Sequence, residues 1–206
     1  MTQSARAERR DAVVETKRRM ILEAALRVFA TNGLHDASMR TIANEAGYAP
    51  GAIYAYFSSK EHIYAAALDE SLTRLCEATQ TGAATATDAR ERIVAAGLAF
   101  FDFYDANPRD LDLGFYLFGG GIQPRGLSDE LNQQLNAALL TTLEPVRHAA
   151  LELGADQAQA TTLTADAFAH ASGLLLLAHT RRLDLFQLDA RQLMHQHMNQ
   201  LADKLH

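Results

Sequence analysis

Residues 38–61 read SMRTIANEAGYAPGAIYAYFSSKE, and this stretch carries the most specific pattern of the chain. Ser38 is a good N-cap for a short helix, because its side chain can accept a hydrogen bond from an amide of the first turn. Gly47 ends that helix, and Pro50 lies in the first turn of another one, where proline is tolerated, that ends near Phe57. The stretch therefore predicts two short helices joined by a tight turn.

The spacing inside this stretch meets the packing needs of a helix-turn-helix. Two helices that cross through a short turn need a small residue where their backbones meet, and Ala43 is expected there. Gly47 follows four residues later and can adopt the left-handed conformation of the turn, and Ile53 then points back to the core. The remaining inward positions are Ile42, Ala46, Tyr48 and Phe57.

The other side chains of the stretch form an outer face that can meet DNA. They are Arg40, Thr41, Ala49, Pro50, Gly51, Ala52, Tyr54 and Tyr56. Tyr54 and Tyr56 flank the inward Ile53, so the two phenols cannot both be buried. A phosphate or base contact is favoured over a purely structural role for these tyrosines, more strongly for Tyr56.

Charge is divided unevenly along the chain. The net charge of the 206 residues is −6, which taken alone argues against nucleic acid. Residues 1–60, however, hold nine Lys and Arg against six Asp and Glu, whereas residues 61–206 hold ten against nineteen. Only the N-terminal part has the charge that a polyphosphate attracts, so the DNA-binding surface is expected there.

Helical patterns extend over the whole sequence. A first helix is expected at residues 17–31, beginning as early as Glu8 and ending at Asn32-Gly33. Further helices are expected at residues 38–46, 50–57, 60–80, 88–106, 108–117, 128–153, 155–183 and 189–205. The sequence thus predicts an all-α fold of about nine helices, with a small N-terminal domain at residues 1–60 and a larger helical domain at residues 61–206.

Arg6, Arg9 and Arg10 precede the first apolar stripe. A solvated tail is the favoured interpretation of these arginines, and an arm that enters the minor groove of DNA is the alternative.

The segment of residues 17–61 resembles the signature of the TetR family of transcriptional regulators. The resemblance implies an N-terminal three-helix DNA-binding domain and a C-terminal helical domain for effector binding and dimerisation. It also implies a homodimer that binds a two-fold, double-stranded DNA operator and releases it when a small-molecule effector binds.

The resemblance assigns roles by position. It places Arg40 and Thr41 at the start of the support helix near the phosphates, and it makes Lys60 a phosphate contact. The recognition helix contains Pro50, Gly51, Ala52, Tyr54 and Tyr56. Many relatives carry Ser or Thr early in this helix, where this chain has Ala49, Gly51 and Ala52. More of the binding is therefore expected to depend on phosphates and DNA shape.

Seven of the fifteen Phe and Tyr residues lie within residues 100–118. The cluster fits either a packed core or an apolar ligand cavity, and both can hold for different rings. Polar groups that could orient a ligand are few, namely Gln123, Arg147, His148, Asp166 and His170, and the last two can also simply pair with each other. The predicted ligand-binding residues, around a mostly apolar effector, are Phe100, Phe103, Tyr104, Phe115, Phe118, His148, Asp166 and His170.

The last two expected helices each carry an apolar stripe. In the helix of residues 155–183, the neighbouring surface consists of the small residues Ala169, Ser172 and Gly173. The two DNA-binding domains of a dimer must be held about 34 Å apart to bind a two-fold site, and this needs a fixed interface between the subunits. A pair of helices from each subunit can provide that interface. The predicted interface comprises Ala167, Ala171, Leu174, Leu175, Ala178, Met194, Met198 and Leu201. Either stripe can also pack inward on its own domain.

Several other classes of protein are not expected. No apolar run approaches the roughly 20 residues of a membrane span, no secretory signal precedes the first helix, and the single Cys76 cannot form an internal disulfide. A soluble cytoplasmic protein without a membrane partner is expected. His195 and His197 would point about 200° apart on a helix, and no motif for a metal, a nucleophile or a phosphate loop occurs.

The sequence therefore predicts no metal, no cofactor and no enzymatic activity. The predicted function is that of a ligand-responsive regulator, in the form of a repressor. The alternative is an all-α small-molecule-binding or adaptor protein with a vestigial helix-turn-helix.

Overall fold

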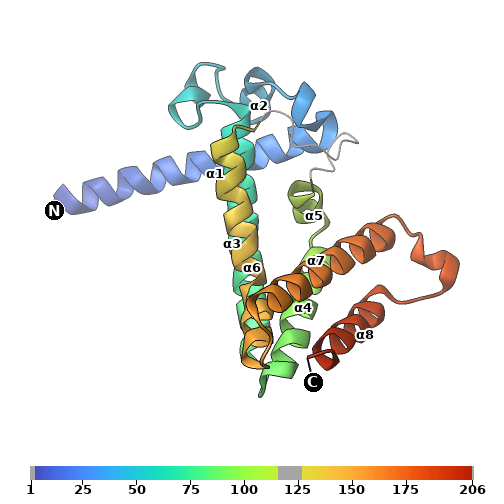
Figure 1. Ribbon diagram of the computed structural model, residues 1–206. Helices are drawn as coiled ribbons and strands as arrows, with labels where there is room; N and C mark the ends of the chain where they lie inside the picture. The colour runs from blue at the N-terminus through green and yellow to red at the C-terminus, as the bar shows by residue number, and fades with distance from the viewer. Residues whose placement is uncertain (1–2, 116–126, 206) are drawn as a thin grey trace. The chain divides into compact units, whose positions relative to one another are not determined.

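The computed structural model describes residues 3–115 and 127–205, in which every regular element is a helix (Figure 1). The elements are α1 (Gln3–Asp36), α2 (Met39–Glu45), η1 (Ala52–Ala55), α3 (Lys60–Ala84), α4 (Ala89–Ala106), α5 (Pro108–Gly114), α6 (Asp129–Glu152), α7 (Gln157–His179), η3 (Leu183–Phe186) and α8 (Ala190–Asp203). The prediction of an all-α fold is confirmed. None of the described helices is both long enough and apolar enough to cross a membrane.

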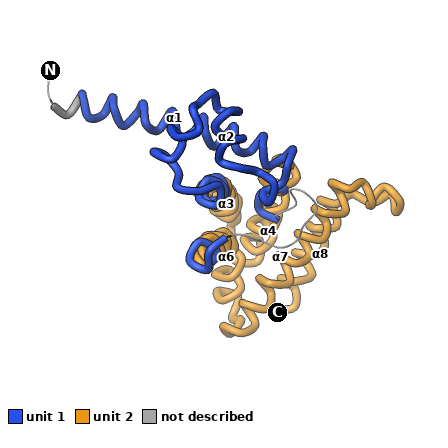
Figure 2. Tube along the Cα trace, turned by 90° about the horizontal axis from the view of Figure 1, so that it is seen from above, with its two compact units in different colours: residues 1–70, 112–132 blue, residues 71–111, 133–206 orange. Residues whose placement is uncertain are grey.

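The chain forms two compact units (Figure 2). Unit 1 comprises residues 1–70 and 112–132, and unit 2 comprises residues 71–111 and 133–206. Helices α3 and α6 each begin in unit 1 and end in unit 2. The proposed domain boundary after Lys60 falls inside unit 1 and stays a prediction.

Helix α1 is longer than its apolar pattern predicts. It starts at Gln3, and its residues 6–16 are exposed, so this first part forms a helical arm that precedes the packed part of the helix (Figure 1). At the other end the path is kinked at Gly33, where φ is 74° and ψ is 164°. This left-handed conformation is open to glycine at little cost, so the predicted stop at Asn32-Gly33 appears as a kink followed by a last turn.

The core of unit 1 is formed by side chains from four of its helices. Phe29 of α1 and Ile42 of α2 are fully buried, as are Ile53 of η1 and Tyr64 of α3. The Phe29 and Tyr64 rings meet edge to face with 5.9 Å between their centroids. The Tyr64 hydroxyl donates a hydrogen bond to the Leu113 carbonyl. This bond gives the one polar group of the buried Tyr64 ring a partner.

In unit 2, helices α4, α7 and α8 pack against one another. Two ion pairs join α4 and α8, Arg90 to Asp203 at 2.6 Å and Arg191 to Asp102 at 2.7 Å. Because each pair links the start of one helix to the end of the other, α4 and α8 run antiparallel. The pairs are half-exposed and add little stability, so the buried apolar side chains between the helices carry most of it.

Candidate nucleic-acid interface and effector cavity

The helix-turn-helix geometry follows the predicted spacing. Ser38 caps α2, with its Oγ accepting from the Thr41 amide at 3.1 Å. Ala43 is fully buried, and Gly47 has a φ of +75°. The Tyr48 amide then returns to the Ala43 carbonyl at 2.8 Å, which closes the turn. A bulkier residue at position 43 would separate the two elements.

The recognition element differs from its prediction. Residues 50–57 were expected to form an α-helix, but the regular part is a single 3-10 turn, Ala52–Ala55. The Tyr56 amide bonds to the Ile53 carbonyl three residues back at 3.0 Å. Such a short segment containing Pro50 and Gly51 offers too few hydrogen bonds to nucleate a full α-helix, since both residues are weak helix formers.

The outer face of this element is presented as predicted. Ala49, Pro50, Gly51, Ala52 and Tyr54 are exposed, together with Arg40 and Thr41 of α2. Tyr54 is the most prominent apolar side chain of the face, with 57% of its surface exposed. The Thr41 hydroxyl lies 2.7 Å from Ser38 Oγ, so it is already engaged in the cap. The DNA contacts of the residues on this outer face stay predictions.

Tyr56 lies at the edge of this face and is half-buried. Its ring lies beside that of Tyr48, with 6.4 Å between centroids, and its carbonyl accepts from the Arg18 guanidinium at 3.5 Å. Arg18 also lies 4.3 Å above the Phe57 ring. Helix α1 therefore holds the end of the recognition element in place through one arginine.

Lys60 has a structural partner that the sequence did not predict. Its ammonium donates to the His35 carbonyl at 2.6 Å and to the Ala37 carbonyl at 2.9 Å. These carbonyls belong to the end of α1, which a cation stabilises. Two of the three N–H groups are used in this way, so a phosphate contact of Lys60 stays a prediction that leaves one donor for DNA.

The aromatic cluster of unit 2 is mostly core. Phe100 and Tyr104 are buried, with 5.2 Å between their ring centroids, and Phe168 of α7 meets Phe100 at 5.8 Å. Burial, with a smaller contribution from Asp110, raises the pKa of Tyr104 well above its usual value, so this phenol stays neutral.

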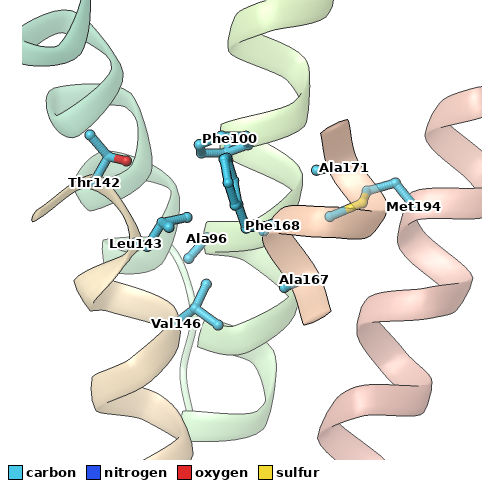
Figure 3. A pocket seen from close by; sticks show the side chains of 10 residues that line it. Ala96, Phe100, Thr142, Leu143, Val146, Ala167, Phe168, Ala171 and Met194 are labelled. Carbon is cyan, nitrogen blue, oxygen red and sulfur yellow. The ribbon is translucent and has the colours of Figure 1, made fainter. Parts of the chain in front are cut away.

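A small cavity lies beside these rings (Figure 3). Its lining comes from α4, α6, α7 and α8, and comprises Ala96, Gly97, Phe100, Thr142, Leu143, Val146, Ala167, Phe168, Ala171 and Met194. Its volume is only ≈ 10 Å³, about enough for one water molecule. Thr142 supplies the one hydroxyl of the lining, and that hydroxyl already donates to the Leu139 carbonyl at 2.7 Å.

A second cavity of ≈ 180 Å³ lies between α6 and α7 and shares Leu143 and Phe168 with the first. Its polar side is formed by Arg147 and Glu144, whose Nη2 and Oε2 atoms lie 2.7 Å apart. The hydrogen bonds of Arg147 lower the pKa of Glu144, and this carboxylate raises the pKa of Arg147. The side chains of Leu143 and Phe168, which line both cavities, lie between them.

The remaining predicted ligand residues are dispersed. Phe103 lies on α4 near the Arg74 guanidinium, 5.8 Å from its ring, and His148 is exposed. Phe115 is half-buried and belongs to unit 1. Phe118 lies outside the described residues, as does Gln123.

Asp166 and His170 do not form the isolated pair that their spacing would allow. Asp166 lies 3.2 Å from His197 Nε2 on α8, and the His170 ring stacks on that of His197 with 3.7 Å between centroids. Burial and then the neighbouring His197 lower the pKa of His170, and Asp166 partly opposes this. The sequence prediction missed His197 because the α7–α8 contact joins residues far apart in the chain. Among the described residues, no three His, Cys, Asp or Glu side chains form a group that could hold a metal.

The residues of the predicted dimer interface lie mostly inside unit 2. Seven of the eight residues are buried within the chain, namely Ala167, Ala171, Leu174, Leu175, Met194, Met198 and Leu201, and Ala178 is half-buried. These stripes form the contact of α7 and α8 with each other and with α4, because the apolar face of a helix packs first on its own unit. The seven buried side chains have little surface left for a partner in this conformation, and the predicted interface stays a prediction. The exposed side of α7 carries Ala165, Ala169, Gly173 and Leu176 instead.

The N-terminal segment is similar to known regulators. Residues 21–67 match the family described as bacterial regulatory proteins, tetR family. The HTH-type transcriptional activator FasR of Mycolicibacterium smegmatis is 37% identical over 101 residues, which are 49% of this chain and 46% of that protein. The uncharacterized HTH-type transcriptional regulator YdgC of Bacillus subtilis is 31% identical over 50% of this chain and 55% of its own length. The chain thus spans about half the length of the curated relatives it matches.

Solved structures extend the similarity in fold to nearly the whole chain. The transcriptional regulator FadR from Bacillus subtilis, in complex with stearoyl-CoA, has a TM-score of 0.69 at 22% identity over 91% of this chain and 98% of its own. FadR from Bacillus halodurans has a TM-score of 0.68 at 21% identity, over 90% of this chain and 94% of its own.

The fold and the exposed recognition element define an all-helical helix-turn-helix protein with a second helical unit. Within that protein, the segment that contains the helix-turn-helix matches the TetR family of bacterial regulatory proteins. The two curated relatives named above are described as HTH-type transcriptional regulators.

Proposed function

We propose that this protein is a ligand-responsive transcriptional regulator, most simply a repressor, that binds a two-fold operator as a homodimer and is released by an apolar effector. The observation that carries the proposal is the capped helix-turn-helix of residues 38–57 with its exposed outer face, inside a segment that matches the TetR family.

DNA binding is tested with Arg40→Ala and Tyr54→Ala on a duplex from upstream of the chain's own coding sequence. Each variant is expected to bind about tenfold to a hundredfold more weakly, since a single phosphate or base contact contributes about 1–3 kcal/mol. Arg109→Ala is the matched control, because Arg109 is an exposed arginine of unit 2. Unaltered binding of both test variants would contradict the proposed surface.

The effector is proposed to be a long acyl chain. The cavity beside Phe100 is lined almost entirely by apolar side chains, and FadR from Bacillus subtilis was solved with stearoyl-CoA. Because the cavity is small here, a chain can enter only if α6 and α7 separate around Leu143 and Phe168, which would join it to the larger cavity. Each methylene buried should add about 0.8 kcal/mol, so affinity should rise with chain length.

A thermal-shift series of acyl-CoA thioesters, with coenzyme A alone as the reference, measures this dependence. Ala167→Leu fills the small cavity and should abolish binding of the long chains while DNA binding persists. Ala137→Leu, on the exposed side of α6, is the control. Binding of an effector by a protein that binds no DNA would favour the alternative of a small-molecule-binding protein with a vestigial helix-turn-helix.

The homodimer is proposed to form through the exposed side of α7. Ala165, Ala169 and Gly173 are spaced four residues apart and have little side-chain bulk, so a second helix can approach closely. Sedimentation should show a dimer, and its interface is expected to bury well over about 1,200 Å². Gly173→Arg should give a folded monomer, because a side chain at Gly173 meets nothing within 4 Å. Ala171→Arg should instead unfold unit 2, and a wild-type monomer would refute the dimer.

A further inference from the structure

The arm of α1, residues 3–20, is not accounted for by the packing of unit 1. Its residues 6–16 are all exposed, and Val13, Val14 and Met20 keep about half of their surface exposed. Burial therefore does not explain why this part of the chain is helical and charged. The arm holds six Lys and Arg against three Asp and Glu, in a chain whose net charge is −6.

Four of the six basic side chains of the arm share one face of the helix. At 100° per residue, Arg6, Arg9, Arg10 and Lys17 fall within an arc of about 100°. The carboxylates of Glu8, Asp11 and Glu15 fall within about 60° on the opposite side of the helix, where Arg18 and Arg19 also lie. Arg10 lies 3.6 Å from Asp11 in an exposed ion pair, and such a pair is weak enough to be exchanged for a phosphate contact. The basic face is therefore suited to a polyanion.

The base of the arm is fixed to the recognition element. Arg18 contacts the Tyr56 carbonyl and the Phe57 ring, so the arm leaves the packed part of α1 beside the surface proposed to read DNA. Both belong to unit 1. Figure 1 shows the arm as a continuous helix that extends beyond the rest of this unit.

We infer that the basic face of the arm, Arg6, Arg9, Arg10 and Lys17, is a second DNA-contacting element that binds phosphates flanking the site read by the helix-turn-helix. The inference rests on the proposed DNA-binding function and adds a surface to it. The twelve helical steps from Arg18 to Arg6 span about 18 Å, which matches the length of about five base pairs. An α-helix is too wide to enter the minor groove of DNA. We therefore infer a contact with the phosphate backbone in place of an arm that enters the minor groove.

The test uses the full-length protein and two duplexes. The first carries the region that the protein protects upstream of its own coding sequence, and the second lacks about five base pairs of flanking DNA at each end. Wild-type protein is expected to bind the longer duplex at least about tenfold more tightly. A variant with Arg6→Ala, Arg9→Ala and Arg10→Ala should bind the two duplexes equally, because alanine keeps the helix and removes the charges.

Salt dependence provides a second readout. Removing one phosphate contact should reduce the slope of log K against log salt by about 0.9, so the slope of the triple variant should be smaller by about 2–3 units. Arg19→Ala is the matched control on the other side of the helix and should keep the flank dependence. Circular dichroism should show unchanged helix content in all variants.

The possible outcomes separate a failure of this inference from a failure of the proposed function. A wild-type protein that binds both duplexes equally, or a triple variant that keeps the flank dependence, would overturn the inference while leaving the proposed function intact. A triple variant that changes the sedimentation coefficient and not the flank dependence would assign the arm to a second copy of the chain and also overturn it. Failure of the wild type to bind any upstream duplex would reject the proposed function itself.

Discussion

Gly97 of α4 packs against Met198 of α8, and this contact allows a sharp test of the packing in unit 2. A Cβ atom added at Gly97 would lie 2.5 Å from Met198 Cε, 2.7 Å from Sδ and 3.0 Å from Cγ. Met198 is fully buried, and three successive atoms of its side chain are too close, so rotating only its terminal methyl does not relieve the overlap. Gly97→Ala must therefore move α4 and α8 apart or displace Met198.

The magnitude follows from two opposing effects. Replacing a helical glycine by alanine stabilises by about 1 kcal/mol, and overpacking a core costs about 1–3 kcal/mol. A net loss of up to about 2 kcal/mol is expected for Gly97→Ala in urea unfolding followed by circular dichroism. Met198→Ala alone should cost about 2–5 kcal/mol by leaving a cavity.

The double variant decides the cause. If the methyl group introduced by Gly97→Ala and the side chain of Met198 compete for one space, the double variant should be more stable than the sum of the single effects by about 1–3 kcal/mol. Additive effects within about 0.5 kcal/mol, or stabilisation by Gly97→Ala alone, would refute the close contact between these two residues.

Three further changes test other contacts. Lys60→Met should lower the melting temperature, because it removes a cation from two carbonyls at the end of α1. The expected loss in the free energy of unfolding is about 1–3 kcal/mol. A loss of DNA affinity at unchanged stability would instead support a phosphate contact. Gly82→Ala should destabilise unit 2, because the new Cβ would lie 2.6 Å from Ala99 Cβ, which cannot rotate away. An unchanged urea unfolding curve would contradict this prediction. The lowered pKa of His170 means that the folded protein binds this proton less readily than the unfolded chain, so stability should fall as pH decreases through about 6.5. Urea midpoints at pH 7.5 and 5.5 should therefore differ less in His170→Asn than in the wild type, whereas equal differences would show that the stack on His197 is not responsible.

The helix-turn-helix was predictable because its signals are local. A cap at Ser38, a breaker at Gly47 and a small residue at Ala43 each act within a few residues, and the structure has all three as the spacing predicts. The form of the recognition element was not predictable in the same way. Pro50 is compatible with either an α-helix or a 3-10 turn, and the short segment between Gly51 and Phe57 decides between them.

The proposed interface and effector site could not be located from periodicity alone. A stripe such as Ala167, Ala171 and Leu175 shows that one side of α7 is covered, but it does not say whether another helix of the same chain or a partner covers it. Here α4 and α8 cover it. The link between Asp166 and His197 likewise depends on the packing of α7 against α8, for which no local signal exists.

The 3-10 geometry of η1 has a thermodynamic consequence. A single turn of this kind has poorer hydrogen-bond geometry than an α-helix, so its amide protons should exchange with solvent at a much lower opening free energy than those of α1. If the segment becomes fully ordered only on DNA, conformational entropy decreases at the moment of recognition and must be offset by favourable enthalpy. The affinity for the operator would then weaken on warming more steeply than that of a protein whose reading helix is rigid beforehand.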